Sequence, residues 1–216
     1  MKKFELTAES KINIFGKKLF RIKALISFGD VEEGETGGWI EKEENLEQSS
    51  GNAWVYGNVE VYGNAWVYGN AEVYGNARVY GNARVSGDAE VSGNAWVSGD
   101  AEVSGNARVS GDAEVSGNAW VSGNVEVYGN ARVSGNAEVS GNADYTTIHG
   151  FGTQFRTTTF FQCEDKQIRV SCGCFLGTIP EFREQVKNTR EGKIAEEYLM
   201  IADLMEKHFV KEKRKW

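Results

Sequence analysis

From residue 51 the chain repeats a six-residue unit without interruption, and this period limits what the chain can fold into. Sixteen consecutive hexads of the form Gly-[Asn/Asp]-[Ala/Val]-x-Val-[Tyr/Ser] occupy residues 51–146, and only the last, GNADYT, departs from the pattern. Side chains of an extended strand alternate between two faces. The alanine and valine therefore share one face, while the free position and the closing Tyr or Ser share the other. Because only the second pair carries charge, the first pair must line the interior.

The Gly-Asn or Gly-Asp pair predicts a corner between consecutive hexads, since both residue types tolerate positive φ at low cost. A side of six residues cannot bury its inner face alone, so successive coils must stack on one another. The charges at the free position indicate how many sides each coil has. A two-sided coil would place like charges on adjacent rungs, about 4.8 Å apart, which is unfavourable. The glutamates that would then share one column are Glu90, Glu102, Glu114, Glu126 and Glu138.

A three-sided coil of eighteen residues instead alternates charges and aromatic residues in most rungs, although Glu72 and Glu90, and Glu126 and Asp144, remain neighbours. The aspartates at the corners then fall into three different columns: Asp88, Asp100 and Asp112. The columns at the free position read Trp54, Glu72, Glu90, Arg108, Glu126, Asp144; Glu60, Arg78, Trp96, Glu114, Arg132; and Trp66, Arg84, Glu102, Trp120, Glu138.

The repeat Val-x-Gly-Asn-Ala-x resembles the hexapeptide repeat of left-handed parallel β-helices. The predicted fold is mainly β: a three-sided left-handed parallel β-helix of eighteen residues per coil and about five coils, with an N-terminal β-hairpin cap and a C-terminal α+β module. The left hand is implied by the resemblance alone. We expect three regions: an N-terminal cap with an irregular first coil (1–50), the β-helix (51–146) and a C-terminal ββαα module (147–216).

The flanking segments predict how the two ends are closed. Alternation in residues 4–9 and 11–25 predicts a hairpin that turns near Gly16, and Trp39 and Ile40 are expected to point inward in the first coil. Tyr145 replaces the last valine and is too large for its slot, so the solenoid should stop or be capped there.

In the C-terminal region, QFRTTTFFQC (154–163) and QIRVSCGCF (167–175) predict a second hairpin. Thr178 and Glu181 have the spacing of a capping box that opens a helix. A further helix is indicated by apolar residues at helical spacing: Ile194, Tyr198, Ile201, Met205 and Phe209.

Two flanking strings also resemble uncharacterised proteins of bacteriophages and gut bacteria. RIKAL, FGDV and GGWIEKEENL, directly before the repeat, resemble a leader found in such proteins. The segment RVSCGCFLGTIPEFREQV with EYLMIADLM resembles a small C-terminal module of phage proteins. These resemblances imply a phage-encoded protein in the host cytoplasm.

The sequence predicts no catalytic residue, no metal site and no cofactor. Resemblance to hexapeptide-repeat acyltransferases implies a histidine base and loop insertions, but the solenoid has neither, and the chain's two histidines, His149 and His208, lie after it. A capping role is expected for His149. Cys172-Gly-Cys174 lacks the CxxC spacing that zinc sites prefer, so these two cysteines and Cys163 are expected to be strand residues. Three cysteines and the absence of a signal peptide or transmembrane run indicate a cytoplasmic protein.

The remaining candidate site is an aromatic and arginine-rich surface on the first coils. Its predicted binding residues are Trp54, Tyr56, Tyr62, Trp66, Tyr68, Tyr74, Arg78, Tyr80 and Arg84. Three interpretations stay open: the aromatics stack on one another or beneath the N-terminal hairpin, they mediate self-association, or they recognise a separate ligand.

We therefore expect a non-catalytic binding or assembly protein, with a homo-oligomer as its first partner and a trimer favoured by the resemblance. A narrower hypothesis is an inhibitor of host defence that binds a host protein or sequesters a nucleotide. The alternatives are an acyltransferase relative and a structural spacer or virion component. A net charge of −7 argues against general nucleic-acid binding, and no membrane partner is expected.

Overall fold

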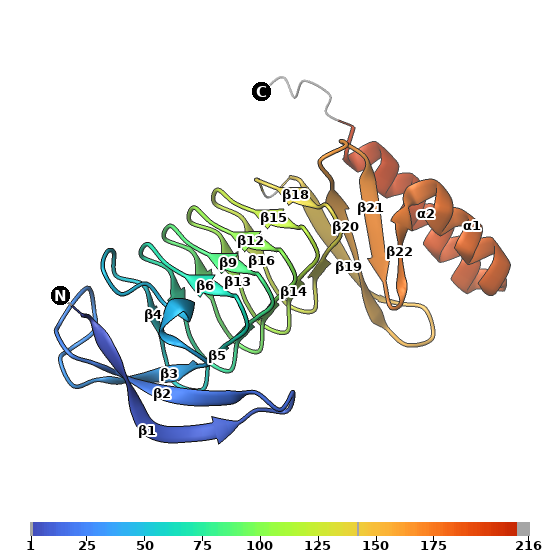
Figure 1. Ribbon diagram of the computed structural model, residues 1–216. Coiled ribbons are helices and arrows are strands. Elements are labelled where there is room, and N and C mark those ends of the chain that lie inside the picture. Colours follow the sequence, from blue (N-terminus) through green and yellow to red (C-terminus); the bar gives the residue numbers. More distant parts are fainter. Residues whose placement is uncertain (1, 142, 211–216) are drawn as a thin grey trace.

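The computed structural model describes residues 2–141 and 143–210 of the chain. An elongated solenoid forms the middle of the molecule, with a twisted hairpin at its N-terminal end and a small sheet with two helices at its C-terminal end (Figure 1). This arrangement confirms the predicted mainly-β, three-sided parallel solenoid with a cap at each end.

Each face of the solenoid is a parallel sheet whose strands come from every third hexad. The first face holds β5 (Glu60–Val61), β8 (Arg78–Val79), β11 (Trp96–Val97), β14 (Glu114–Val115) and β17 (Arg132–Val133). The second holds β4 (Trp54–Val55), β7 (Glu72–Val73), β10 (Glu90–Val91), β13 (Arg108–Val109) and β16 (Glu126–Val127). The third holds β6 (Trp66–Val67), β9 (Arg84–Val85), β12 (Glu102–Val103), β15 (Trp120–Val121) and β18 (Glu138–Val139).

The strand register confirms the eighteen-residue turn. Val91 pairs with Val73 on one side and with Val109 on the other, and the same step recurs on the other two faces. The hexad alanines and valines form one continuous buried core along the solenoid. Burial of apolar surface gains about 25 cal/mol per Å², so this column of small branched side chains is the main favourable term for the repeat.

The corners are held by backbone geometry and by a ladder of amides. The repeat glycines that open the fifteen hexads from Gly51 to Gly135 all have positive φ. In each of the three corner columns, asparagine side chains donate to the residue one turn later, as in Asn58 to Asn76 at 3.2 Å and Asn76 to Asn94 at 3.3 Å. The Asp112 carboxylate accepts a hydrogen bond from Asn94 at 2.9 Å. Because a carboxylate side chain has no N–H to donate to the next coil, the run of side-chain donors ends there.

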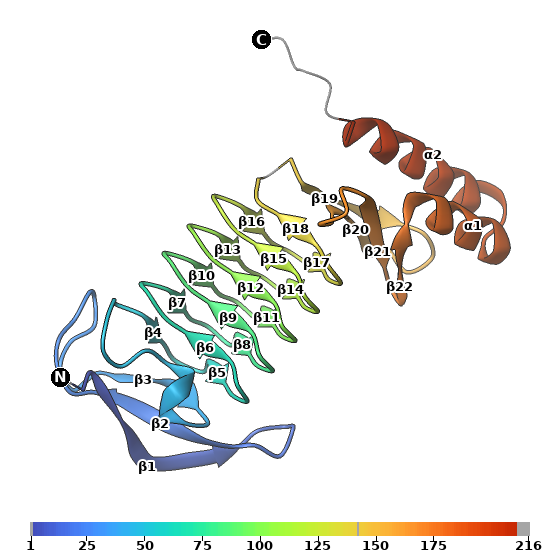
Figure 2. The ribbon, with the colours of Figure 1, turned by 45° about the horizontal axis from the view of Figure 1, so that its top comes forward.

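The N-terminal hairpin continues one solenoid face instead of lying apart from it. β1 (Phe4–Ile12) pairs antiparallel with β2 (Lys18–Ala24), β2 pairs with β3 (Thr36–Ile40), and β3 pairs in parallel with β5 (Figure 2). A short 3-10 helix, η1 (Glu43–Asn45), and the bridge from Leu46 to Val67 begin the third face.

One expectation for this first coil is wrong. Ile40 lies opposite Val61 and is buried in the core, as predicted, but Trp39 lies opposite Glu60 and so points outward. Trp39 is covered there by the hairpin, since Lys11 and Arg21 stack on its ring at 4.7 and 4.8 Å.

The C-terminal end contains more strands than the expected ββαα module. Four antiparallel strands form its sheet: β19 (Tyr145–Phe151), β20 (Arg156–Gln162), β21 (Ile168–Cys172) and β22 (Phe175–Thr178). Two helices follow, α1 (Ile179–Thr189) and α2 (Gly192–His208), and the Thr178–Glu181 capping box opens α1 as predicted. Residues 145–151 escaped prediction because they continue the chain directly from the repeat without a turn signal.

Tyr145 ends the solenoid core as predicted. β18 is the last two-residue rung, and the buried Tyr145 ring opens β19, where its hydroxyl donates to the backbone carbonyl of Glu126. Tyr145, Phe161 and Cys163 belong to the same buried cluster as the solenoid valines, so the small sheet covers the end of the column.

Candidate functional site

The nine predicted binding residues do not form one surface, because the three-sided winding distributes them over three faces. Each face receives three of them: Trp54, Tyr56 and Tyr74 around β4 and β7; Tyr62, Arg78 and Tyr80 around β5 and β8; and Trp66, Tyr68 and Arg84 around β6 and β9. A single aromatic and arginine pocket, as a nucleotide ligand would need, is therefore not assembled from them within one chain.

On the β4 face, the structure corrects the assignment of Trp54 to an exposed surface. Its side chain is fully buried and makes edge contacts with Phe4 and Phe28, at centroid distances of 6.1 and 5.5 Å. The Tyr74 hydroxyl donates to Glu90 at 2.9 Å, which orients this exposed ring along the face. These aromatics hold the N-terminal segment and the outer ladder in place.

The same face is acidic at its N-terminal end. Burial, with Asp30 and Glu90 nearby, raises the pKa of Glu72 above its ordinary value. Burial also raises the pKa of Tyr56 to about 12, and its hydroxyl donates to Glu72 at 3.5 Å. Tyr56 is thus a neutral hydrogen-bond donor at physiological pH and has no role as a proton acceptor.

On the β5 face, the hairpin covers the aromatics. Tyr62 is buried, which also corrects its assignment, and it stacks on Tyr80 with centroids 5.1 Å apart and planes 4° apart. Phe15, at the hairpin tip, lies 6.1 Å from Tyr62 and 6.0 Å from Tyr80. Burial raises the pKa of Tyr62.

Charges beside this stack are also paired within the chain. The buried Glu60 carboxylate contacts Lys11 at 2.8 Å and Arg78 at 3.5 Å. The guanidinium of Arg78 lies over the Trp96 ring at 5.3 Å. Packing beneath the hairpin, one of the three interpretations left open by the sequence, accounts for this group.

The β6 face leaves its tryptophans open. Trp66 is 37% exposed and stacks on Tyr68 with centroids 4.0 Å apart, and Arg84 is exposed on the next rung. Trp120, which was outside the predicted set, is 48% exposed and donates from Nε1 to the Ser104 hydroxyl at 3.3 Å. The signal for Trp120 was present in the sequence, since it shares an eighteen-residue column with Trp66.

The histidines and cysteines form no reactive group. His149 lies on β19, exposed, with Nδ1 3.2 Å from the Thr157 hydroxyl of the neighbouring strand. Cys163 is buried, which raises the pKa of its thiol to about 11. Within residues 2–141 and 143–210, no group of three or more His, Cys, Asp or Glu side chains has a geometry that would hold a metal ion.

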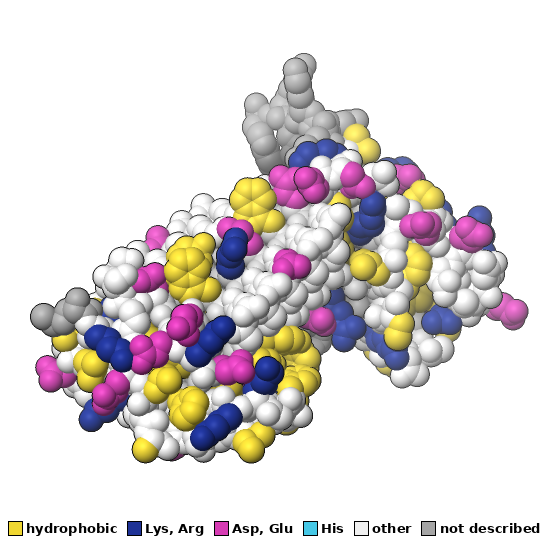
Figure 3. Space-filling model, viewed as in Figure 1, with side chains coloured by type: hydrophobic (Ala, Val, Ile, Leu, Met, Phe, Trp, Pro, Cys, Tyr) yellow, Lys and Arg dark blue, Asp and Glu magenta, His cyan; other side chains and the backbone are white. Residues whose placement is uncertain are grey.

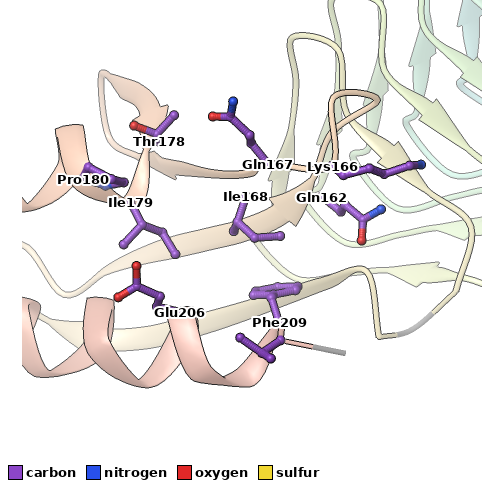
Figure 4. A pocket seen from close by; sticks show the side chains of 10 residues that line it. Gln162, Lys166, Gln167, Ile168, Thr178, Ile179, Pro180, Glu206 and Phe209 are labelled. Atoms are coloured by element: carbon purple, nitrogen blue, oxygen red, sulfur yellow. The ribbon is translucent and has the colours of Figure 1, made fainter. Parts of the chain in front are cut away.

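A pocket of about 480 Å³ opens in the C-terminal module between its sheet and the end of α2 (Figure 4). Ile168, Ile179 and Phe209 give it an apolar lining, while Lys166 and Glu206 lie toward its margins. Its other polar lining residues are Gln162, Gln167 and Thr178, and Glu206 is the one acid among the described residues that line it.

Comparison with known proteins gives one family. Residues 61–156 match the model of the bactofilin family, which is described as polymer-forming cytoskeletal. The matched segment runs from β5 through the solenoid to the start of β20, and leaves out the N-terminal hairpin and both helices. No curated protein matches the chain in sequence.

This finding corrects the expected relationship to uncharacterised proteins of phages and gut bacteria, because residues 61–156 match the bactofilin model. The strings that carried the phage resemblance lie within residues 21–46 and 169–205, outside the matched range. The family is described by polymer formation, which agrees with the prediction that the chain is not an enzyme. In the described part of the chain, none of the helices has the length and apolar character needed to span a membrane.

Proposed function

We propose that this protein is a non-catalytic structural element whose rigid solenoid assembles with further copies of itself. The observation that carries the proposal is the match of residues 61–156 to a family described as polymer-forming. The proposal favours the structural alternative raised by the sequence over the binding of a separate ligand. The proposal keeps the three regions predicted from the sequence: the N-terminal cap (1–50), the solenoid (51–146) and the C-terminal module (147–216).

The closed ends of the solenoid bear on how copies meet. An open solenoid end presents unpaired strand edges that another chain can extend. Here each of the three last rungs already contacts the C-terminal sheet: Ala137 pairs with Cys163, the Arg132 N–H donates to Thr159 Oγ1 at 3.0 Å, and the Tyr145 hydroxyl bonds the Glu126 carbonyl.

At the N-terminal end, β2 pairs with the outer edge of β3, and Gln48 exchanges hydrogen bonds with the backbone of Lys3 and Phe4. With the three last rungs and the edge of β3 occupied, growth by stacking one bare solenoid on another is disfavoured. The proposal therefore places self-association on the lateral faces.

Sedimentation velocity over a concentration series, with electron microscopy of the same samples, tests this function. We expect species larger than 23.9 kDa whose fraction rises with concentration. A His149→Ala variant, changed outside the solenoid faces, serves as control and should assemble like the unmodified protein. A protein that stays monomeric at every concentration would contradict the proposal.

A further inference from the structure

One arginine on the solenoid differs from the others in having no ionic partner among the residues that the structure describes. Arg78 pairs with Glu60 at 3.5 Å, Arg108 with Glu90 at 3.2 Å, and Arg132 with Glu114 at 3.5 Å. Arg84 and its rung neighbour Glu102, both described by the structure, make no ion pair with any other described residue. Two opposite charges are thus left available on adjacent rungs of one face.

The rungs on either side of these charges carry the exposed indoles of that face. Reading from β6 to β15, the free position holds Trp66, Arg84, Glu102 and Trp120, and each is in register with the next. The second outward position on this face is serine after Tyr68, with Ser86 buried and Ser104 and Ser122 half-buried. In Figure 2 no other helix or strand lies over β9, β12 and β15 of this face, whereas at its C-terminal end Lys166 contacts Glu138 of β18. Its surface is largely neutral, with separate hydrophobic, basic and acidic side chains (Figure 3).

If the same column is laid against itself in the reverse direction, each arginine meets a glutamate and each tryptophan meets a tryptophan. We propose that the β6–β9–β12–β15–β18 face binds the same face of a second copy, with the two solenoid axes antiparallel. A two-fold axis between the β9 and β12 rungs, parallel to the strands, sets Arg84 of each copy opposite Glu102 of the other. The same operation sets Trp66 level with Trp120, as in an isologous contact. This inference rests on the proposed self-assembly and names its surface.

A parallel arrangement of the two copies is excluded by the same charges. It would set Arg84 level with Arg84 and Glu102 level with Glu102, and like charges across an interface cost several kcal/mol. At the next rung, Glu138 is already neutralised by Lys166 at 2.7 Å, so it adds little repulsion in the antiparallel arrangement.

The other two faces lack this self-complementary order. The β4 face begins with Trp54, which is buried, followed by the adjacent acids Glu72 and Glu90. The β5 face is partly covered by the hairpin, and its arginines are already paired with Glu60 and Glu114. An isologous contact closes at two copies, so this proposal takes the place of the trimer implied by the resemblance.

The size of the face sets the strength we expect. Five rungs at about 4.8 Å each give a length of about 24 Å, and six extended residues give a width of at most about 20 Å. Full coverage would bury roughly 500 Å² per copy, less than the roughly 800 Å² of a standard interface. The dimer should therefore dissociate on dilution in the micromolar range.

Charge reversal with sedimentation equilibrium at low ionic strength tests the contact. Arg84→Glu or Glu102→Arg alone places like charges opposite each other twice, and should weaken dimerisation at least tenfold. The double variant Arg84→Glu/Glu102→Arg restores both pairs and should recover most of the affinity. Trp120→Ser should weaken dimerisation without affecting thermal unfolding of the monomer.

Arg132→Glu is the matched control, because it reverses an exposed arginine on another face and should leave dimerisation unchanged. If the unmodified protein associates and both single reversals associate equally well, the contact is wrong while the proposed function stands. If the unmodified protein does not associate at all, the proposed function itself fails.

Discussion

At the scale of single residues, the corner glycines make the close stacking of the coils possible. Gly93 has φ +66°, and a Cβ added there would lie 2.8 Å from the carbonyl oxygen of Gly111 on the next coil. Gly129 has nearly the same φ, +67°, but a Cβ there would meet nothing within 4 Å. Comparing substitutions at these two positions therefore distinguishes the strain of a positive-φ backbone from the steric cost of a clash between stacked coils.

We expect Gly129→Ala to lower the free energy of unfolding by about 1–2 kcal/mol, because an L residue is strained at positive φ. Gly93→Ala should cost at least about 1 kcal/mol more, since it adds a clash with a neighbouring backbone that cannot move independently. Urea denaturation followed by circular dichroism measures both. Equal losses would show that the coils have room to separate.

At the scale of elements, the sequence predicted most of the solenoid but not the surface that the hairpin covers. The faces, the inward valines and the corner ladders follow from local periodicity. The burial of Trp54 depends on Phe4 and Phe28, which are distant in sequence and whose register against the solenoid leaves no periodic trace. For the same reason an outward position was mistaken for an exposed one at Trp54 and Tyr62, while Trp39, which was expected to point inward, lies outward beneath the hairpin.

The difference between covered and open rungs predicts unequal costs for the same substitution at the same hexad position. Trp54→Ala should lower the free energy of unfolding by about 3–5 kcal/mol, as expected for emptying a fully buried site. Trp120→Ala should change it by no more than about 0.5 kcal/mol in the monomer, because its ring is half exposed. Thermal or urea unfolding at high dilution distinguishes them, and similar losses would mean that the hairpin does not pack on Trp54.

At the scale of the whole molecule, the order of residues that indicated a three-sided coil also places the residues of the proposed dimer contact in one column. Arg84, Glu102 and Trp120 could be placed in one column from the sequence. Among the described residues, Arg78, Arg108 and Arg132 each have an ion pair and Arg84 has none. This difference depends on side-chain geometry, which the periodicity of the sequence does not specify.

The register predicts how the molecule tolerates shortening. Deleting residues 93–110 removes one complete turn, so β14 should replace β11 in the same sheet and the solenoid should shorten by about 4.8 Å. Circular dichroism should show retained β-structure, and small-angle scattering the smaller length. Deleting only residues 93–101 removes a corner and breaks the hexad. This smaller deletion should be the more damaging one, and a folded product from it would contradict the importance of the period.

Because every outward side chain belongs to a rung and a face, residue number in this solenoid works as a cylindrical coordinate. The remainder after division by eighteen gives the azimuth, and the quotient gives the height. The interior is built from the same small side chains at every address, so decoration at one address can be exchanged without repacking the core. Such a lattice of independent attachment points allows several contacts, each with its own specificity, to be placed along a single short rod.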